Sequence, residues 1–192
     1  MKTYLIATKN GDKYEITKAL LERVLQSRVS FESLEEVNIE YEVMEKGSIL
    51  ERAEQKAREH WSHLNTGKKE KYSGVIGIDD GFSLNKNEEG DPNSKELTSK
   101  ILQGEFVSKN QTVWLKRGFA VCNDNDLKSC STSIPFTFLG SPENIAGKNG
   151  IYPLNCVLAP LGQSNPIEEL NFEETTDYYL KFCAKDLKNL IN

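Results

Sequence analysis

Strand and helix patterns alternate along the N-terminal part of this chain, and that order restricts the folds open to it. Short apolar runs at residues 4–7 and 72–78 predict buried strands, and residues 37–44, where apolar and acidic residues alternate, predict a strand between them. Residues 12–26 and 48–64 carry apolar residues at helical spacing. A chain in which strands alternate with helices predicts an α/β fold.

The rest of the chain adds both kinds of element. The patterns predict helices at residues 94–102 and 173–191, strands at 112–122, 129–139 and 156–161, a turn at 123–126, and loops at 85–93 and 144–150. Neighbouring strands joined by a short turn pair antiparallel, so we expect a mixed central sheet flanked by helices. The 192 residues suffice for a single domain over residues 1–192, or for one domain with two lobes.

Composition excludes several classes of function. The net charge of −5 lacks the basic surplus that neutralises nucleic-acid phosphates, so we expect no nucleic-acid partner. The four cysteines are dispersed without a Cys-x-x-Cys pair and accompany only two histidines, which argues against a zinc site and suits a reducing cytoplasm. No apolar run is long enough to span a bilayer or to form a signal peptide.

Residues 8–13, Thr-Lys-Asn-Gly-Asp-Lys, join the first strand to the first helix. A helix N-terminus presents free N–H groups and partial positive charge, so a turn with Thr8, Asn10 and Lys13 could hold phosphate oxygens. An ordinary turn in which Asn10 or Asp12 caps the helix is the alternative.

The second helix carries Glu51, Glu54 and Lys56 near its start. Ser48 and Glu51 have the spacing of a capping box, so Glu51 could serve only as a helix cap. Glu54 and Lys56 could equally form a solvated face.

The third strand runs into Asp79-Asp80-Gly81. Ligand sites in open α/β sheets lie beyond the carboxyl ends of strands, and adjacent carboxylates repel each other unless a cation neutralises them. Magnesium prefers oxygen ligands and often takes one or two carboxylates together with substrate phosphates. These residues therefore favour a metal site, with a turn stabilised by Asp79 or Asp80 as the alternative.

The three clusters together resemble the inosine/xanthosine triphosphate pyrophosphatase superfamily. Thr8, Asn10 and Lys13 match its Thr-x-Asn-x-x-Lys motif. Glu51, Ala53, Lys56 and Ala57 match Glu-x-Ala-x-x-Lys-Ala, and Asp79, Asp80 and Gly81 match Asp-Asp-(Ser)-Gly without the serine. The resemblance extends in order over nearly the whole chain, although these motifs lie before residue 82.

The resemblance implies an enzyme that hydrolyses non-standard purine nucleoside triphosphates to the monophosphate and pyrophosphate with Mg²⁺. It implies an elongated mixed sheet with two lobes, a nucleotide in the cleft between them, and a homodimer. By resemblance Glu51, Asp79 and Asp80 hold the metal, and Asp80, with Glu51 and Lys56, serves catalysis. By the same resemblance, Lys13 and Lys56 neutralise the charge of the phosphates, and Thr8 and Asn10 position the phosphates.

The C-terminal half departs from the family pattern. Tyr152 keeps part of a Gly-(aromatic)-Gly-Tyr-Asp-Pro segment that contacts the base, and Lys181 stands at best where the family has the arginine of Ser-His-Arg. Residues 144–150 instead resemble the Asn-Ile-Gly-x-Lys-x-Gly loop of a smaller branch. Two alternatives to the leading prediction stay open: a relative that binds nucleotides without turnover, and a triphosphatase with a different base preference.

Overall fold

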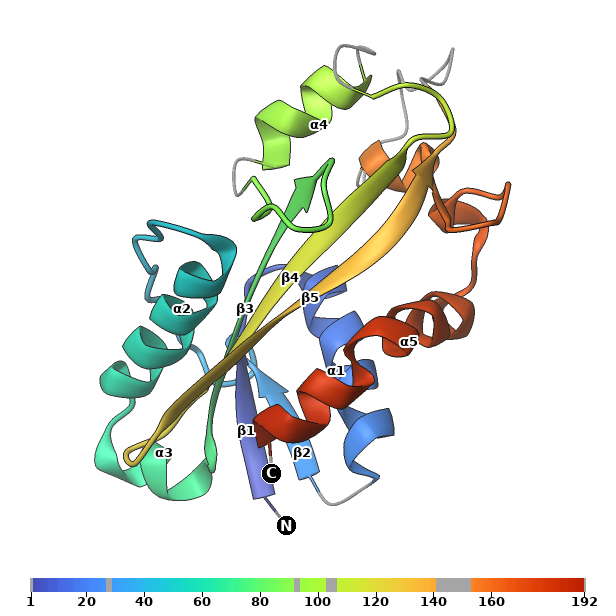
Figure 1. The fold of residues 1–192 in the computed structure, drawn as a ribbon. Helices are drawn as coiled ribbons and strands as arrows, with labels where there is room; N and C mark the ends of the chain where they lie inside the picture. Colours follow the sequence, from blue (N-terminus) through green and yellow to red (C-terminus); the bar gives the residue numbers. More distant parts are fainter. Residues whose placement is uncertain (1, 27–28, 92–93, 103–106, 141–152, 192) are drawn as a thin grey trace.

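A mixed β-sheet with helices on both faces forms the centre of the computed structural model, which describes residues 2–26, 29–91, 94–102, 107–140 and 153–191 (Figure 1). The strands of the described residues are β1 (Lys2–Ala7), β2 (Val29–Ser33), β3 (Gly74–Ser83), β4 (Thr112–Cys122), β5 (Leu127–Phe138) and β6 (Leu158–Pro160). They are ordered β2-β1-β3-β4-β5-β6, with β1 parallel to β2 and β3 and the remaining pairs antiparallel. The predicted α/β fold with a mixed sheet is confirmed.

Helices cover the two faces of this sheet separately. They are α1 (Gly11–Leu25), α2 (Ile49–His63), α3 (Thr66–Lys71), α4 (Ser94–Leu102) and α5 (Phe172–Ile191), with short 3₁₀ turns η1 (Pro153–Cys156) and η2 (Ile167–Glu169). In Figure 1, α2 lies on one side of the strands and α1 and α5 lie on the other. Among the described helices, none combines the length and apolar character needed to cross a membrane.

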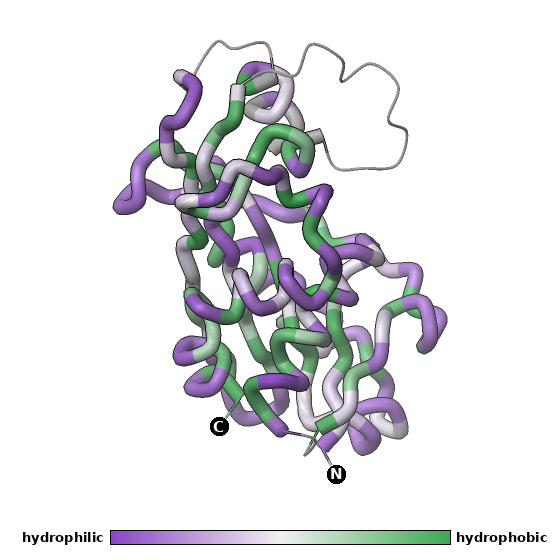
Figure 2. Tube along the Cα trace, turned by 90° about the vertical axis from the view of Figure 1, so that its right-hand side faces the viewer, coloured by the Kyte–Doolittle hydropathy of each residue, from purple (hydrophilic) through white to green (hydrophobic). Residues whose placement is uncertain are grey.

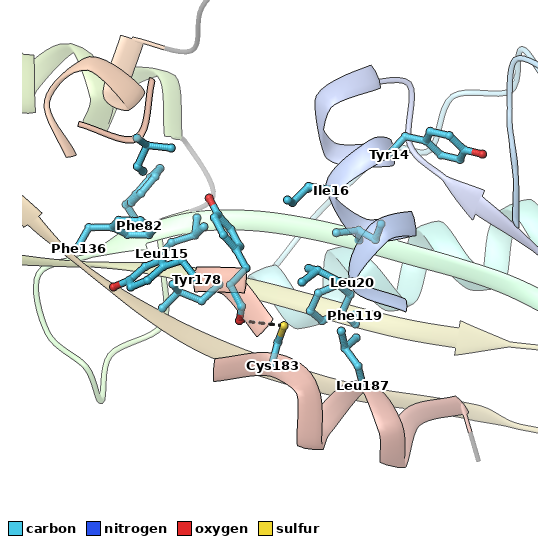
Figure 3. Packing of buried hydrophobic residues seen from close by; sticks show 14 of the residues in the cluster. Tyr14, Ile16, Leu20, Phe82, Leu115, Phe119, Phe136, Tyr178, Cys183 and Leu187 are labelled. Atoms are coloured by element: carbon cyan, nitrogen blue, oxygen red, sulfur yellow. Dashed lines mark hydrogen bonds between the residues drawn. The ribbon is translucent and has the colours of Figure 1, made fainter. Parts of the chain in front are cut away.

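Each face of the sheet has its own hydrophobic cluster, because successive side chains of a strand point to opposite faces. Leu5, Ala7 and Val75 pack with α2, whereas Tyr4 and Ile6 belong to the cluster on the α1 and α5 face. Figure 3 shows Leu20 of α1, Phe119 of β4 and Leu187 of α5 close together between the two helices, with Cys183 of α5 beside them. The peripheral loops are mostly hydrophilic in Figure 2, as expected for segments in contact with water.

Gly77 allows α2 to lie directly against the sheet. A Cβ atom at this position would lie 2.0 Å from the carbonyl oxygen of Ala53 and 2.6 Å from the amide nitrogen of Ala57. Because glycine has no Cβ, the backbone of α2 can approach β3 at van der Waals distance. Lys56 is thereby brought within reach of the residues that follow Gly77.

The connections of β1 create a switch point in the sheet. The chain leaves β1 through α1 to reach β2 on one side, and returns through α2, on the opposite face, to β3 on the other side. In open α/β sheets, ligands bind where the connections diverge in this way, outside the carboxyl ends of the strands. The topology therefore points to the edge of the sheet where β1 ends beside β3.

Two predicted strand assignments need correction. The second strand is Val29–Ser33, paired with β1, whereas residues 37–44 form no strand and their extended part is held against α2 by side chains. The alternation of apolar and acidic residues is equally compatible with an extended segment lying on a helix. The third strand also continues past Asp79 and Asp80 to Ser83, because β4 pairs with it along its length after β1 has ended at Ala7.

Candidate active site

The turn after β1 places Lys13 beside the acidic pair. Asn10 caps α1, since its Oδ1 accepts a hydrogen bond of 2.9 Å from the Lys13 amide, and Thr8 Oγ1 accepts one of 3.2 Å from the Asn10 amide. Thr8 and Asn10 therefore shape the turn. The Lys13 ammonium extends to Asp79 and Asp80, at 3.7 Å from Asp79 Oδ1 and 3.4 Å from Asp80 Oδ2.

Asp79 and Asp80 point to opposite faces of β3. Asp79 belongs to the face covered by α2, and Asp80 to the face covered by α1 and α5. Both follow Gly77, the last β3 residue that pairs with β1, so they border the space beyond the end of β1. Opposite orientation separates the two carboxylates, and each has its own cationic partner.

Lys56 is the partner of Asp79 on the α2 face. Its Nζ lies 3.0 Å from Asp79 Oδ1, 3.0 Å from Glu45 Oε1 and 3.0 Å from the carbonyl oxygen of Ile78. The Lys56 side chain is only 13% exposed, so the ammonium is well shielded and interacts strongly with both carboxylates. The prediction that Lys56 belongs with the acidic pair is consistent with this geometry.

Arg117 of β4 is the partner of Asp80 on the other face. Its Nε donates to Asp80 Oδ1 at 2.7 Å and its Nη2 to Asp80 Oδ2 at 2.9 Å, a bidentate pair between cross-strand neighbours. The ring of Tyr179 lies 5.1 Å from the guanidinium carbon. Burial alone would raise the pKa of Asp80, but the charges of Arg117 and Lys13 outweigh it and hold that pKa at about 2.

Glu51 forms the capping box at the start of α2. Its Oε2 accepts a hydrogen bond of 2.8 Å from the Ser48 amide, while Ser48 Oγ accepts one of 3.3 Å from the Glu51 amide. The hydrogen bonds from Ser48 lower the pKa of the Glu51 carboxyl. The capping alternative is therefore realised, and the metal role of Glu51 stays a prediction. Glu54 accepts a hydrogen bond of 2.5 Å from Ser129 Oγ and does not join the cluster.

Glu45 is a member of this cluster that the sequence motifs did not single out. The segment that carries it is fastened to α2, because the Gln55 side chain exchanges two hydrogen bonds of 2.9 Å with the backbone of Lys46 and Arg52 Nε donates to the Gly47 carbonyl at 3.1 Å. Its only signal in the sequence is an acidic residue three positions before Ser48, the N-cap of the helix that carries Lys56.

The two C-terminal residues predicted to bind substrate have different outcomes. Tyr152 lies outside the described residues. Lys181 is exposed on α5, with its ammonium 5.8 Å from the centre of the Tyr178 ring, and the structure does not bring it to Asp80. The residue of α5 that reaches the acidic pair is Tyr179, through its contact with Arg117.

The carboxylates of the cluster suit a divalent cation held by few protein ligands. Asp79 Oδ2 is buried and has no hydrogen-bond partner among the described residues, although a buried carboxylate oxygen normally has one. Within the same part of the chain, no three acidic, imidazole or thiol groups lie together as a metal cluster. Magnesium needs only one or two protein carboxylates when substrate phosphates supply the rest, so Asp79, with Glu45 or Asp80 nearby, fits that ion.

Comparison with known proteins places this geometry within a known fold. Neither a protein-family model nor a curated protein sequence matches the chain. The solved structures that match it include a HAM1 protein from Coxiella burnetii (17% identity, TM-score 0.64, 100% of this chain and 98% of that one) and the Ham1 protein of Staphylococcus aureus (18%, 0.59, 91% and 89%). They also include a nucleoside-triphosphatase, or dITP/XTP pyrophosphatase, from Mycobacterium abscessus (22%, 0.57, 98% and 97%). The family resemblance is thus confirmed at the level of the fold: this chain folds as the Ham1 and dITP/XTP pyrophosphatase structures do.

Proposed function

We propose that the protein is a Mg²⁺-dependent pyrophosphatase that hydrolyses non-standard purine nucleoside triphosphates, namely those of inosine, xanthosine and deoxyinosine, to the monophosphate and pyrophosphate. The observation that carries the proposal is the convergence of Lys13 and Lys56 on Asp79 and Asp80 at the switch point of the sheet. The fold shared with a dITP/XTP pyrophosphatase supports the same reaction class.

The two lysines would bind the phosphates. Lys13 stands at the N-terminus of α1, where free backbone N–H groups add positive character, and its side chain is 20% exposed. Lys56 is held deeper, between Asp79 and Glu45. A polyphosphate that entered beside the end of β1 would meet Lys13 first. Lys13 would then give up its long contacts with Asp79 and Asp80 and bind the phosphates instead.

The carboxylates divide the remaining work. Asp79 and Glu45 would hold the metal, which when bound neutralises phosphate charge and polarises the phosphoryl group. Asp80 would accept a hydrogen bond from the attacking water and orient it toward the α-phosphate, so that the bond between the α and β phosphates breaks. A carboxylate with a pKa of about 2 stays ionised at neutral pH, so Asp80 is better suited to accept a hydrogen bond from the water than to take up its proton.

A substrate panel tests the proposal directly. The triphosphates of inosine, xanthosine, deoxyinosine and the standard bases are supplied with Mg²⁺, and pyrophosphate is measured against phosphate. Pyrophosphate released from the inosine and xanthosine substrates, and lost on chelation, is the expected result. Release from another base only would show a different specificity, and tight binding without release would show a nucleotide-binding protein.

Three further expectations accompany the proposal. The homodimer and the roles of Tyr152 and Lys181 in binding the base stay predictions of the sequence resemblance, and the cytoplasmic location stays a prediction from the dispersed cysteines. Sedimentation of the purified protein tests the first, and the substrate constants of the Tyr152→Phe and Lys181→Ala variants test the last.

A further inference from the structure

Arg117 is a buried cation in the middle of a central strand. The residue is 4% exposed and lies on β4 directly across from Asp80 of β3. Two hydrogen bonds of 2.7 and 2.9 Å join its guanidinium to both oxygens of that carboxylate. The pairing fixes the plane of the Asp80 carboxylate, because a guanidinium fork matches both oxygens at once.

Stability alone is a weak reason for this pair. Removing two charges from water costs several kcal/mol per ion, and apolar residues of similar volume often replace a buried ion pair without loss. The pair is also incompletely satisfied, because Arg117 Nη1 is buried with no hydrogen-bond partner among the described residues. Thr132 Oγ1, on the cross-strand neighbour of Arg117, is in the same condition. A buried polar arrangement that leaves donors unused calls for a reason other than stability.

The surroundings of Arg117 hold it in one orientation. The Tyr179 ring of α5 lies 5.1 Å from its guanidinium carbon, and burial raises the pKa of Tyr179 to about 12, so this neighbour stays neutral. Lys13, the other cation near Asp80, makes only a longer contact of 3.4 Å and is more exposed. Arg117 is therefore the partner that remains with Asp80 if Lys13 turns toward a phosphate.

We propose that Arg117 is a positioning residue for the hydrolysis: by binding both oxygens of Asp80 it holds that carboxylate in the direction from which it orients the attacking water. The inference rests on the proposed function and deepens it, since it assigns to β4 a residue on which turnover depends. Arg117 acts through Asp80 and touches neither the substrate nor the water. Its loss is expected to lower kcat and to leave the binding of nucleotide unchanged.

The test compares Arg117→Met and Arg117→Lys with Lys116→Met. Lys116 is the matched control, because it is a buried cation on the same strand, 8% exposed, which points to the opposite face and donates to Ser133 Oγ at 2.9 Å. For each protein, kcat and KM are measured with the best substrate of the panel. The affinity for a non-hydrolysable α,β-imido triphosphate with Mg²⁺ is measured by calorimetry, and the melting temperature is recorded.

Arg117→Met is expected to lower kcat by about a hundredfold, the size of effect that displacement of a catalytic group by about 1 Å produces, with unchanged KM and unchanged analogue affinity. Arg117→Lys, which keeps the charge and loses the fork, is expected to retain the fold and to recover only part of kcat. It decides the test if Arg117→Met does not fold. Lys116→Met is expected to melt at a lower temperature with wild-type kcat.

Three results would overturn the inference. The first is wild-type kcat in both Arg117 variants, or in Arg117→Lys alone where Arg117→Met does not fold. The second is a loss that appears in KM and analogue affinity rather than in kcat, and the third is an equal loss of kcat in Lys116→Met. If the wild-type protein itself releases pyrophosphate from no nucleotide, the proposed function fails and the inference fails with it. An active wild type with fully active Arg117 variants would remove the inference alone.

Discussion

Lys56 and Asp79, 23 positions apart in the chain, are joined by a contact of 3.0 Å between Nζ and Oδ1. The same ammonium lies 3.0 Å from Glu45 Oε1, so one side chain of α2 connects the extended segment before the helix with the strand beyond it. Because Gly77 lets α2 lie against β3, this contact depends on backbone packing as well as on charge.

Replacing Lys56 by methionine keeps the length of the side chain and removes the charge. We expect kcat/KM to fall by about a hundredfold, since a preorganised cation at the phosphates is lost. The free energy of unfolding should fall by about 3 kcal/mol, because Asp79 would remain buried with only the longer Lys13 contact. Steady-state kinetics and urea unfolding measure the two effects. Lys69→Met, which loses contacts with Asp124 and the Trp61 ring away from the acidic pair, serves as the control. Full activity in Lys56→Met would remove Lys56 from the site.

Three variants distinguish the roles of Glu45 and Glu51. Glu51→Gln should retain stability, because glutamine also completes a capping box, whereas Glu51→Ala should lose about 1 kcal/mol of stability. Full activity in both variants would leave Glu51 as a helix cap only. Glu45→Gln should weaken Mg²⁺ binding and turnover while the helix start is unchanged. Calorimetric titration with Mg²⁺ and substrate analogue measures the difference. An inactive but stable Glu51→Gln protein would instead show that Glu51 is the ligand.

The sequence predicted the parts of this fold that depend on local pattern. Asn10 as a cap, the capping box of Ser48 and Glu51, and the turn between β4 and β5 all follow from neighbouring residues, and all are present. Residues 37–44 were assigned wrongly because alternation does not reveal whether an extended segment pairs with a strand or lies on a helix. The Asp80–Arg117 pair spans 37 positions and depends on strand register, which no local pattern contains.

Gly77→Ala tests the close packing of α2. A methyl group would overlap the backbone of Ala53 and Ala57, so the helix must move, at a cost of about 1–3 kcal/mol for overpacking. The same movement would withdraw Lys56 from Asp79, and activity should fall with stability. Gly67→Ala, in α3, meets nothing closer than 3.8 Å and should be neutral or stabilising by about 0.5–1 kcal/mol. Denaturant unfolding compares the two, and equal stabilities would show that α2 is not confined by Gly77.

His60 should make the protein less stable in mild acid. Burial, aided by the charge of His63, lowers the pKa of His60 to about 4 in the folded state, from an ordinary value of 6.5. The unfolded chain therefore binds the proton more readily, so stability is full above about pH 6.5 and falls by up to about 3 kcal/mol as the pH decreases to 4. Urea unfolding across this range measures the loss. His60→Phe should remove most of it while His63→Gln retains it, and an unchanged slope in His60→Phe would assign the loss to other groups.

Asp80→Asn is the substitution that bears most directly on the chemistry. The amide is nearly isosteric but carries no charge, so it is a weaker acceptor for water and for the Arg117 fork. Turnover should fall by about 10²–10⁴-fold, the range for loss of a positioned proton acceptor, while the α,β-imido analogue still binds. Normal turnover would remove Asp80 from the mechanism.

The same variant should also change the acid dependence of stability. Because the folded pKa of Asp80, about 2, lies below the ordinary 3.8, its ionisation stabilises the folded protein above about pH 4, and that stability is lost as the pH falls from 4 toward 2. Without divalent metal, the wild type should lose about 2 kcal/mol more than Asp80→Asn over this window. Asp80→Asn should already be less stable at pH 7, because Arg117 remains buried without its counter-charge. If stability fell with pH identically in the two proteins, Asp80 would not be the ionised partner of Arg117.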